Sequence, residues 1–335
     1  MLRAALPERI CGITMDGIIT DALTKNYGSL CAVDGLTLKA ENEIYGLLGP
    51  NGSGKTTTVR MLTTLLSATS GSAEVCGYDI AKEKSQVRSC ISYVPQDMAV
   101  DIRLTGRENV DLFAKLYGIR DKAERKRIVA DALEVVNLTD RADSMTKTYS
   151  GGMKRRLELA QALVHQPRVL FLDEPTIGLD VASRRTIWEH ITKLKKSGMT
   201  ILVTTHQMEE AERYCNKVGI IRRGKLIKEG APAFLKADLK KEIITVKSDG
   251  NLPNSLPEGV TFIETNESGF IFSADKGSNI LPELTAAFEA EKSHVIYSSV
   301  REPNLEDVYM QSCGDERGDN IPFDDRQFRN LMTRR

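Results

Sequence analysis

The stretch that most constrains the fold of this chain is a glycine-rich loop, Gly49-Pro50-Asn51-Gly52-Ser53-Gly54-Lys55-Thr56-Thr57. An apolar run, Ile44 to Leu48, precedes it, and a helical pattern through Met61, Leu62 and Leu65 follows, which is the setting that a P-loop requires. Glycines let the backbone aim its N–H groups at one point, and the helix start adds positive potential. The sequence therefore predicts a polyphosphate site, in which Lys55 reaches the β- and γ-phosphates and Thr56 ligates Mg²⁺.

The composition indicates which binding partners and which cellular compartment to expect for this chain. Lys and Arg together number 46, as do Asp and Glu, so no global field attracts nucleic acid or anionic lipid. Six cysteines without a CxxC pair, at positions 11, 31, 76, 90, 215 and 313, predict reduced, cytosolic thiols. The apolar runs are too short to span a bilayer, and charged residues such as Arg3 and Glu8 interrupt any signal-peptide core. Any membrane role is therefore expected to come through another subunit.

Residues 19 to 40 alternate in short segments and predict antiparallel strands, with turns at Tyr27-Gly28 and Asp34-Gly35. Residues 1–19 show weak periodicity and are expected to be an N-terminal extension, to which no function is assigned. An aromatic ring ahead of a P-loop, here Tyr27, can stack on an adenine face. A tyrosine packed at a strand end fits the spacing equally well.

Two more strand-like segments, Ser72 to Tyr78 and Ile91 to Pro95, follow the P-loop helix. Gln96 comes directly after the second, and open α/β sheets place ligand contacts at the carboxyl ends of their strands. A surface glutamine is the usual alternative. Residues 105 to 108 form a capping box, and apolar residues then recur at helical spacing. Residues from about 97 to 165 are therefore predicted to form a helical block inserted into an α/β protein.

A serine and two glycines begin the last predicted helix of this block, in the run Tyr149-Ser150-Gly151-Gly152-Met153-Lys154. Leu157 and Ala160 belong to its expected buried stripe. A serine at this place can be a simple N-cap. The same geometry also presents several backbone N–H groups to an anion in front of the helix.

Two predicted strands end in polar residues. Val169 to Leu172 has the pattern of a strand buried on both faces, and Asp173 and Glu174 follow it. Adjacent carboxylates resist burial unless they meet a cation or do acid–base work, and Mg²⁺ at Thr56 would supply that cation. Residues 200 to 205 form the other strand and lead to His206, which is either structural or in contact with the nucleotide. A hairpin over residues 217–228 closes the core.

Five of these motifs occur in the order found in the ATP-binding subunit of ABC transporters, which residues 20 to 235 resemble. The resemblance implies an α/β fold, with a RecA-like P-loop ATPase core, an antiparallel β subdomain and an inserted helical subdomain. It favours adenine stacking for Tyr27 and makes residues 150 to 154 the signature motif. It also implies that Asp173 binds magnesium beside Thr56, that Glu174 is the general base and that His206 is the switch histidine.

One chain holds half of each catalytic site in the family that this sequence resembles. Two subunits pack head to tail, so that ATP lies between the P-loop of one and the Ser150-Gly151-Gly152 helix start of the other. Asp180 is the D-loop aspartate of that interface, and Gln96 senses Mg²⁺ and the attacking water. Lys55, His206 and Mg²⁺ stabilise charge on the transferred group, whose loss releases the dimer.

The assembly that the resemblance implies is a homodimer or heterodimer of ATP-binding subunits, joined to a separate transmembrane permease subunit. The chain would then be peripheral, on the cytoplasmic face of the cell membrane, with no nucleic acid partner.

Beyond the expected ATPase domain of residues 20–238, residues 239–312 are predicted to form a small C-terminal α/β accessory domain: three strands, a helix near residues 284–288 and a last strand at 295–297. Pro303 to Tyr309 and Lys147-Thr148-Tyr149 resemble motifs of daunorubicin-resistance-type export ATPases, which favours an exporter of drugs, lipids or polysaccharide. Residues 313–335 are expected to be a flexible charged tail. Contact of Phe328 and Leu331 with a membrane or partner is the alternative.

Two other functions fit parts of the pattern. A soluble nucleic-acid- or ribosome-associated ABC ATPase would usually carry two cassettes or a long insertion, whereas this chain has one P-loop, a short stretch from Lys55 to Ser150, and no basic stripe. A subunit that binds nucleotide without hydrolysing it is the second possibility. The presence of both Glu174 and His206 argues against it.

Overall fold

The computed structural model describes residues 17–313, so most of the expected N-terminal extension and tail, with Phe328 and Leu331, lies outside the described residues. The described chain divides into two compact units, residues 17–230 and 231–313. The sequence predicted this boundary after residue 238. The division falls earlier because α8 (Pro232–Ala237) packs against α10 (Leu305–Cys313) and so belongs to the second unit.

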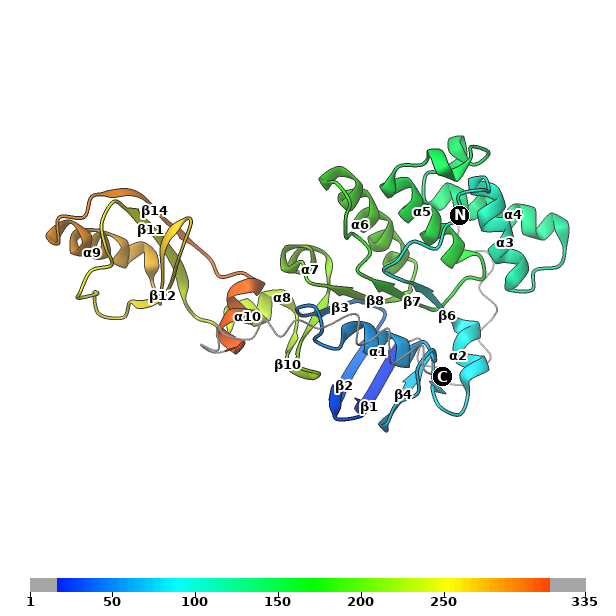
Figure 1. Cartoon of the computed structure of the whole chain (residues 1–335), viewed down its shortest axis with the longest axis horizontal. Helices are drawn as coiled ribbons and strands as arrows, with labels where there is room; N and C mark the ends of the chain where they lie inside the picture. Colours follow the sequence, from blue (N-terminus) through cyan, green and yellow to red (C-terminus); the bar gives the residue numbers. More distant parts are fainter. Residues whose placement is uncertain (1–16, 314–335) are drawn as a thin grey trace. The chain divides into compact units, whose positions relative to one another are not determined.

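The first unit is built on a six-stranded sheet in the order β10-β9-β3-β8-β7-β6 (Figure 1). Its strands are β3 (Ile44–Leu48), β6 (Ile91–Val94), β7 (Val169–Asp173), β8 (Thr200–Thr205), β9 (Lys217–Arg222) and β10 (Lys225–Gly230). All neighbours pair in parallel except β9 and β10, which form the predicted hairpin. Strands β3, β7 and β8 are buried at every position, which confirms the prediction of a strand covered on both faces for residues 169–172.

A second sheet has the order β2-β1-β4-β5 and is antiparallel. Its strands are β1 (Gly17–Tyr27), β2 (Leu30–Glu41), β4 (Ser70–Val75) and β5 (Tyr78–Asp79). The predicted turn after Tyr27 is present, but the predicted turn at Asp34-Gly35 is wrong. Both residues lie inside β2, where Gly35 has a φ of 62° beside a shift in the pairing with β1. A glycine with positive φ serves a bulge as well as a turn, so the dipeptide alone did not distinguish them.

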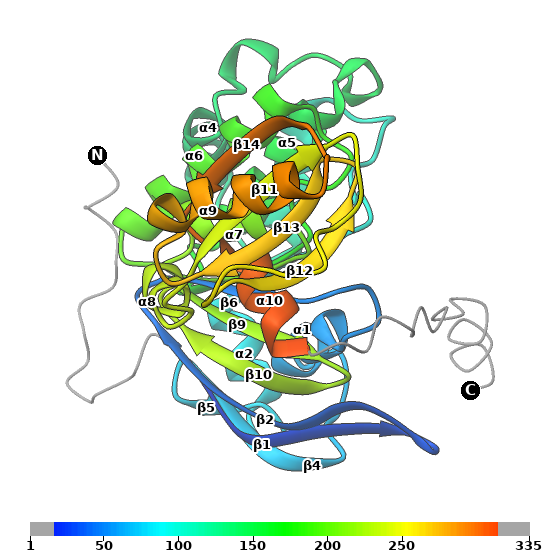
Figure 2. The same cartoon turned by 90° about the vertical axis from the view of Figure 1, so that its left-hand side faces the viewer.

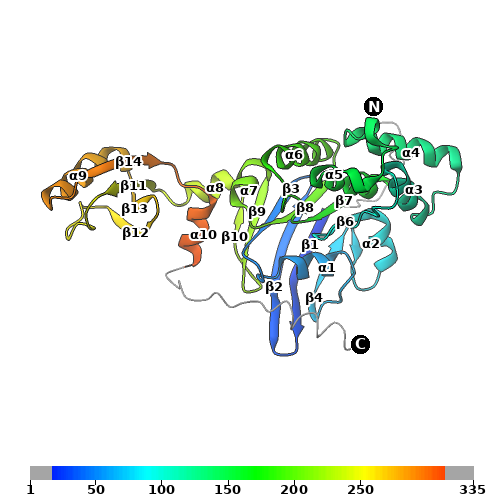
Figure 3. The same cartoon turned by 45° about the horizontal axis from the view of Figure 1, so that its top comes forward.

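Helix α1 (Lys55–Leu62) continues directly from the P-loop and lies between the two sheets (Figure 3). Its residues Val59, Met61 and Leu62 are buried in a core that both sheets share. The helix ends at Leu62, whereas the sequence pattern extended it to Leu65, whose side chain is 63% exposed. The helix therefore anchors the P-loop between two layers of strands.

The predicted helical block is present next to the parallel sheet (Figure 1). It contains α3 (Gly106–Leu116), α4 (Lys122–Val135), the short turns η1 (Thr139–Arg141) and η2 (Thr146–Thr148), and α5 (Gly151–Leu163). Thr105 and Glu108 cap α3 reciprocally, as the capping box predicted. The other helices of this unit are α2 (Lys84–Cys90), α6 (Val181–Lys196) and α7 (Met208–Tyr214).

The second unit contains an antiparallel sheet in the order β12-β13-β11-β14. Its strands are β11 (Glu242–Ser248), β12 (Thr261–Asn266), β13 (Gly269–Ala274) and β14 (Val295–Arg301), and α9 (Gly277–Ala290) packs across them (Figure 2). Leu284 and Phe288 of α9 meet Ile244 and Phe272 in its core. Within residues 17–313, no helix is both long and apolar enough to cross a membrane.

Candidate active site

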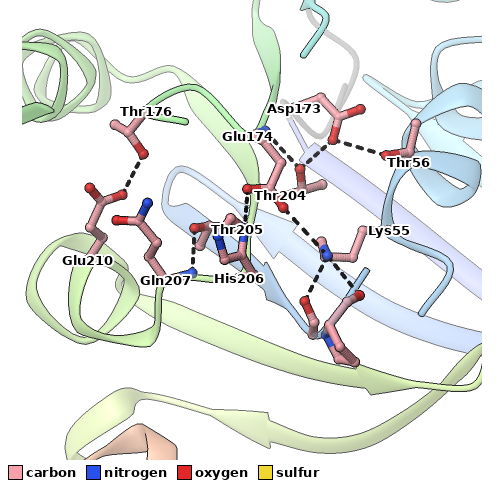
Figure 4. Close-up of polar contacts among 12 residues, drawn as sticks. Lys55, Thr56, Asp173, Glu174, Thr176, Thr204, Thr205, His206, Gln207 and Glu210 are labelled. Atoms are coloured by element: carbon pink, nitrogen blue, oxygen red, sulfur yellow. Dashed lines mark hydrogen bonds and ion pairs between the residues drawn. The ribbon is translucent and has the colours of Figure 1, made fainter. Parts of the chain in front are cut away.

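The candidate site lies at the carboxyl edge of the parallel sheet, where β3, β7 and β8 end side by side. The P-loop follows β3, Asp173 is the last residue of β7, and His206 comes directly after β8. Figure 4 shows the side chains from these three strand ends pointing toward one another. Parallel pairing therefore brings together residues that lie far apart in the sequence.

The P-loop passes too close to neighbouring backbone to carry side chains at its glycines. A Cβ on Gly49 would lie 2.3 Å from the carbonyl oxygen of Ile221, and one on Gly54 would lie 2.4 Å from that of Ala32. Gly52 and Gly54 also have φ values of 79° and 109°, which favour glycine. The loop tip, Pro50-Asn51-Gly52, is exposed, while Ser53 is buried. The structure thus forms the backbone turn that the motif predicted.

Lys55 is buried beneath this loop, with its side chain 6% exposed. Its ammonium donates to the carbonyl oxygens of Gly49 at 2.7 Å and Pro50 at 3.0 Å, and it lies 3.5 Å from a carboxylate oxygen of Glu174. Burial lowers the pKa of Lys55, and the negative charge of Glu174 acts in the opposite direction. The positive charge is therefore held at the base of the loop, where a phosphate chain would meet it.

Glu174 lies between Lys55 and His206 (Figure 4). One carboxylate oxygen faces Lys55, and the other lies 2.7 Å from Nδ1 of His206. An ionised carboxylate only accepts hydrogen bonds, so it favours the imidazole with its proton on Nδ1. Glu174 has a φ of 49°, a left-handed backbone conformation that is uncommon for residues other than glycine. Such strain is typical of functional positions.

Asp173 and Thr56 offer a pair of oxygen atoms suited to a magnesium ion. Asp173 is 1% exposed, and its carboxylate accepts from the hydroxyl groups of Thr56 at 3.3 Å, Thr204 at 2.5 Å and Tyr93 at 3.4 Å. A buried carboxylate surrounded by hydroxyl groups has oxygen ligands that Mg²⁺ prefers. The residues present therefore fit the predicted ion.

Tyr27 ends β1 beside the start of α1. Its ring is partly buried, and Nζ of Lys25 lies 5.3 Å from the ring centroid. Burial raises the pKa of the Tyr27 hydroxyl, and an interaction with the side chain of Thr57 lowers it. The tyrosine predicted to stack on adenine thus borders the last residue of the P-loop motif.

The other predicted site residues do not join this hydrogen-bonded group in the described part of the chain. Gln96 is exposed after β6, and Ser150 is the exposed N-cap of α5, whose hydroxyl accepts from the backbone N–H of Met153. Gly151 is also exposed, whereas Gly152 is buried against Ser183. Asp180 is exposed and caps α6.

Several contact residues were missed by sequence reasoning. Thr204 bonds both the side chain of Asp173 and the backbone N–H of Glu174, and Tyr93 also reaches Asp173. The register that places Thr204 opposite Asp173 depends on strand pairing, which the local sequence does not reveal. Arg155, which follows the Ser150-Gly151-Gly152-Met153-Lys154 run, is also buried, and nothing in the sequence indicated this.

Comparison with known proteins agrees with this geometry. Residues 34–177 match the ABC transporter family. The chain is 36% identical to the daunorubicin resistance ATP-binding protein DrrA2 of Streptomyces coeruleorubidus, over 90% of this chain and 96% of that protein. It is 35% identical to the linearmycin resistance ATP-binding protein LnrL of Bacillus subtilis (87% and 96% covered) and 38% identical to the Nod factor export ATP-binding protein I of Burkholderia orbicola (88% and 96%).

Solved structures show the same fold. An ATP-binding subunit of an ABC transporter superposes with a TM-score of 0.59 at 27% identity, covering 67% of this chain and 93% of that one. The ATP-binding cassette MJ0796, in a dimeric post-hydrolysis state with ADP and Pi, gives 0.58 at 25% identity, with 64% and 98% covered. ATP-binding subunits of this kind dimerise and work with transmembrane partners. The chain therefore belongs to the ABC transporter family, as an ATP-binding subunit with the ATPase activity of that family.

Proposed function

We propose that Lys55, Thr56, Asp173, Glu174 and His206 form the hydrolytic centre of this ATPase. The observation that carries this proposal is the position of Glu174, buried between Lys55 and His206 at the sheet edge where the P-loop begins. A carboxylate held among cationic and hydrogen-bonding groups, next to a phosphate-binding loop, is suited to orient water for attack on a phosphoryl group.

The roles divide according to the contacts. Glu174 is the general base, and His206, which Glu174 orients through Nδ1, presents its other nitrogen to the transferred group. Lys55 moves its charge from the loop carbonyls and Glu174 to the β- and γ-phosphates, which leaves a carboxylate oxygen of Glu174 for the attacking water. Tyr27 stacks on the adenine, and the loop from Gly49 to Thr57 holds the phosphates.

Thr56 and Asp173 would hold Mg²⁺, and Gln96, which follows β6, is proposed as a further ligand. A bound magnesium ion supplies positive charge that offsets the charge of the phosphates. The buried carboxylate of Asp173 would then have a cationic partner in addition to its hydroxyl donors.

The remaining site residues act on a second subunit. Ser150, Gly151 and Asp180 are exposed at the starts of α5 and α6, away from the hydrogen-bonded group of their own chain. A helix start with exposed N–H groups suits a phosphate, so Ser150, Gly151 and Gly152 contact the ATP held by the P-loop of the partner. ATP binding thus closes the dimer, and hydrolysis opens it.

The transport direction is export. This proposal rests on the resistance and export functions in the names of the relatives and on the resemblance of residues 303–309 to export ATPases. Drugs, lipids or polysaccharide are the proposed cargo classes. A separate transmembrane permease forms the path that the cargo takes through the membrane. This chain binds the permease as a peripheral subunit at the cytoplasmic face of the cell membrane.

The general-base role is tested with Glu174→Gln, which keeps the side chain's shape and its contact with His206. Turnover should fall about a hundredfold or more because the base is lost. ATP affinity should remain, and ATP should trap a dimer. Steady-state hydrolysis, fluorescent-nucleotide binding and light scattering measure the three quantities. Glu189→Gln, an exposed change on α6, is the control. Unchanged turnover in Glu174→Gln would remove Glu174 from this role.

Copurification tests the proposed partner. The tagged chain, extracted from membranes in detergent, should bring down an integral-membrane protein, which mass spectrometry identifies. Recovery of ribosomes or DNA, with no membrane protein, would support the soluble nucleic-acid-associated alternative instead.

A further inference from the structure

A buried arginine of α5 connects the strand ends of the active site. The side chain of Arg155 is 4% exposed, and each of its N–H groups has an acceptor. These acceptors are the carbonyl oxygens of Pro95 (2.7 Å), Pro175 (2.9 Å), Asp173 (3.1 Å) and Glu174 (3.3 Å) and the carboxylate of Glu158 (2.9 Å). A guanidinium carries five such donors in a rigid plane, so this site uses all of them.

Glu158 extends the connection to the loop after β6. It is also buried, and its second oxygen accepts from the backbone N–H of Ala99 at 2.6 Å. Arg155 bonds Pro95, at the start of the same loop. The pair therefore fixes both ends of the segment that contains Gln96, and the two charges neutralise each other where water is excluded.

The carbonyl groups that Arg155 bonds surround the strained residue of the site. Glu174 has a φ of 49°, a conformation that persists only when its surroundings impose it. Its own N–H donates to the carbonyl and hydroxyl oxygens of Thr204, which fixes the chain before it. Arg155 fixes the carbonyls of residues 173, 174 and 175. Thr204 thus holds the backbone of Glu174 through its N–H group, and Arg155 holds it through its carbonyl oxygen.

We propose that Arg155 is a positioning residue for ATP hydrolysis, which holds Glu174 in the left-handed conformation that directs its carboxylate to Lys55 and His206. The proposal rests on the role of Glu174 given above. Because Ser150 begins the same helix, a displacement of α5 by an opposing subunit would change the geometry of Glu174 in its own chain.

The test is Arg155→Lys in the full-length chain. Lysine keeps the positive charge but offers three donors at one point, so it cannot reach all of the acceptors. The turnover number should fall about tenfold or more, because misplacement of the base slows the chemical step. ATP affinity should stay within about twofold of the original protein. In the double variant Arg155→Lys/Glu174→Gln, ATP should still trap a dimer, since the helix start at Ser150 is intact.

The matched control is Arg156→Lys, the neighbouring arginine, which donates to the carbonyl oxygens of Val136 and Asn137 after α4. The same substitution there should leave turnover within about twofold of the original. Should Arg155→Lys fail to fold, Glu158→Gln replaces it, because it removes the carboxylate that Arg155 pairs with while keeping the side-chain length. Lower turnover at unchanged ATP affinity is again expected.

Three results would overturn the proposal. The first is a folded Arg155→Lys variant whose turnover stays within about twofold of the original, and the second is an Arg156→Lys variant that loses as much turnover as Arg155→Lys. The third is a loss of ATP binding and dimer trapping in parallel with the loss of turnover, which would indicate a general structural role for Arg155. The separate result for Glu174→Gln distinguishes a failure of the proposed function from a failure of the positioning role alone. Full activity in Glu174→Gln contradicts the proposed function itself, whereas an inactive Glu174→Gln beside an active Arg155→Lys contradicts only the positioning role.

Discussion

Three neighbouring residues of the candidate site each have a feature that usually costs stability. Glu174 adopts a left-handed conformation that costs about 1–3 kcal/mol. Lys55 is buried enough to lower its pKa, and Asp173 is a buried carboxylate whose hydrogen-bond donors are hydroxyl groups. Each feature lowers the stability of the fold. Their concentration at one sheet edge is what a site under functional constraint would show.

Gly54→Ala should abolish ATP binding and lower the free energy of unfolding by about 2 kcal/mol or more. The reason is that φ is 109° and the added Cβ would lie 2.4 Å from the backbone oxygen of Ala32, so the loop must shift. Fluorescent-nucleotide binding and urea unfolding measure the two effects. Gly118→Ala is the matched control, since its φ is 82° but no atom lies within 4 Å of the added Cβ. It should cost about 1–2 kcal/mol and keep ATP binding. Loss of ATP binding in both variants would show that the effect of Gly54→Ala does not come from the geometry of the P-loop.

The sequence singled out as candidates the residues that the structure brings together at this sheet edge, but it did not predict their environment. Lys55, Thr56, Asp173, Glu174 and His206 could be found because each sits at a fixed distance from a strand or a glycine motif. The strain of Glu174 and the burial of Arg155 could not be found in the same way. Both depend on how β7, β8 and α5 pack, which is a tertiary property.

Elements with a long, regular pattern were predicted well. The buried strands β3, β7 and β8 are continuous apolar runs or nearly so, and α3, α4 and α5 repeat apolar residues over several turns. The strands and α9 of the second unit were also predicted in the correct order. In these elements the local pattern and the tertiary packing agree, so the sequence alone specifies them.

Short elements were missed for a physical reason. Helices α2, α7 and α8 have seven, seven and six residues, which is less than the length over which a helical period can be recognised. Such helices are not stable alone and depend on tertiary contacts. The predicted strand over residues 72–78 is likewise interrupted, since Cys76 and Gly77 both have positive φ between β4 and β5. The omission of α8 also displaced the predicted domain boundary.

At the scale of the whole molecule, the starts of α5 and α6 form one exposed feature of the first unit. Gly152 approaches Ser183 so closely that a Cβ would lie 2.5 Å from its hydroxyl oxygen, and Ser183 is bonded to Asp180. Ser150 and Asp180, both exposed, thus belong to neighbouring helix starts. This arrangement suits a surface that meets the P-loop of another chain.

A mixing experiment tests whether each catalytic site is shared between two copies. Lys55→Ala removes the phosphate-binding charge of one chain, and Ser150→Ala removes the helix-start contact that the chain would offer to its partner. Each variant alone should have little turnover, because both sites of its homodimer are damaged. A mixed dimer contains one site with both defects and one site with neither, since the intact Lys55 of one chain faces the intact Ser150 of the other.

With equal amounts and random pairing, mixing should restore about a quarter of the original turnover, because half of the dimers are mixed and each has one intact site. Steady-state hydrolysis, measured over a range of mixing ratios, should be greatest at equal amounts. The control is a mixture of Lys55→Ala with Lys55→Ala/Ser150→Ala, in which no pairing creates an intact site. If the first mixture gave only the sum of its separate activities, Lys55 and Ser150 would not act together across a dimer of identical chains. The peak at equal amounts follows only if the exposed start of α5 completes the site of its partner.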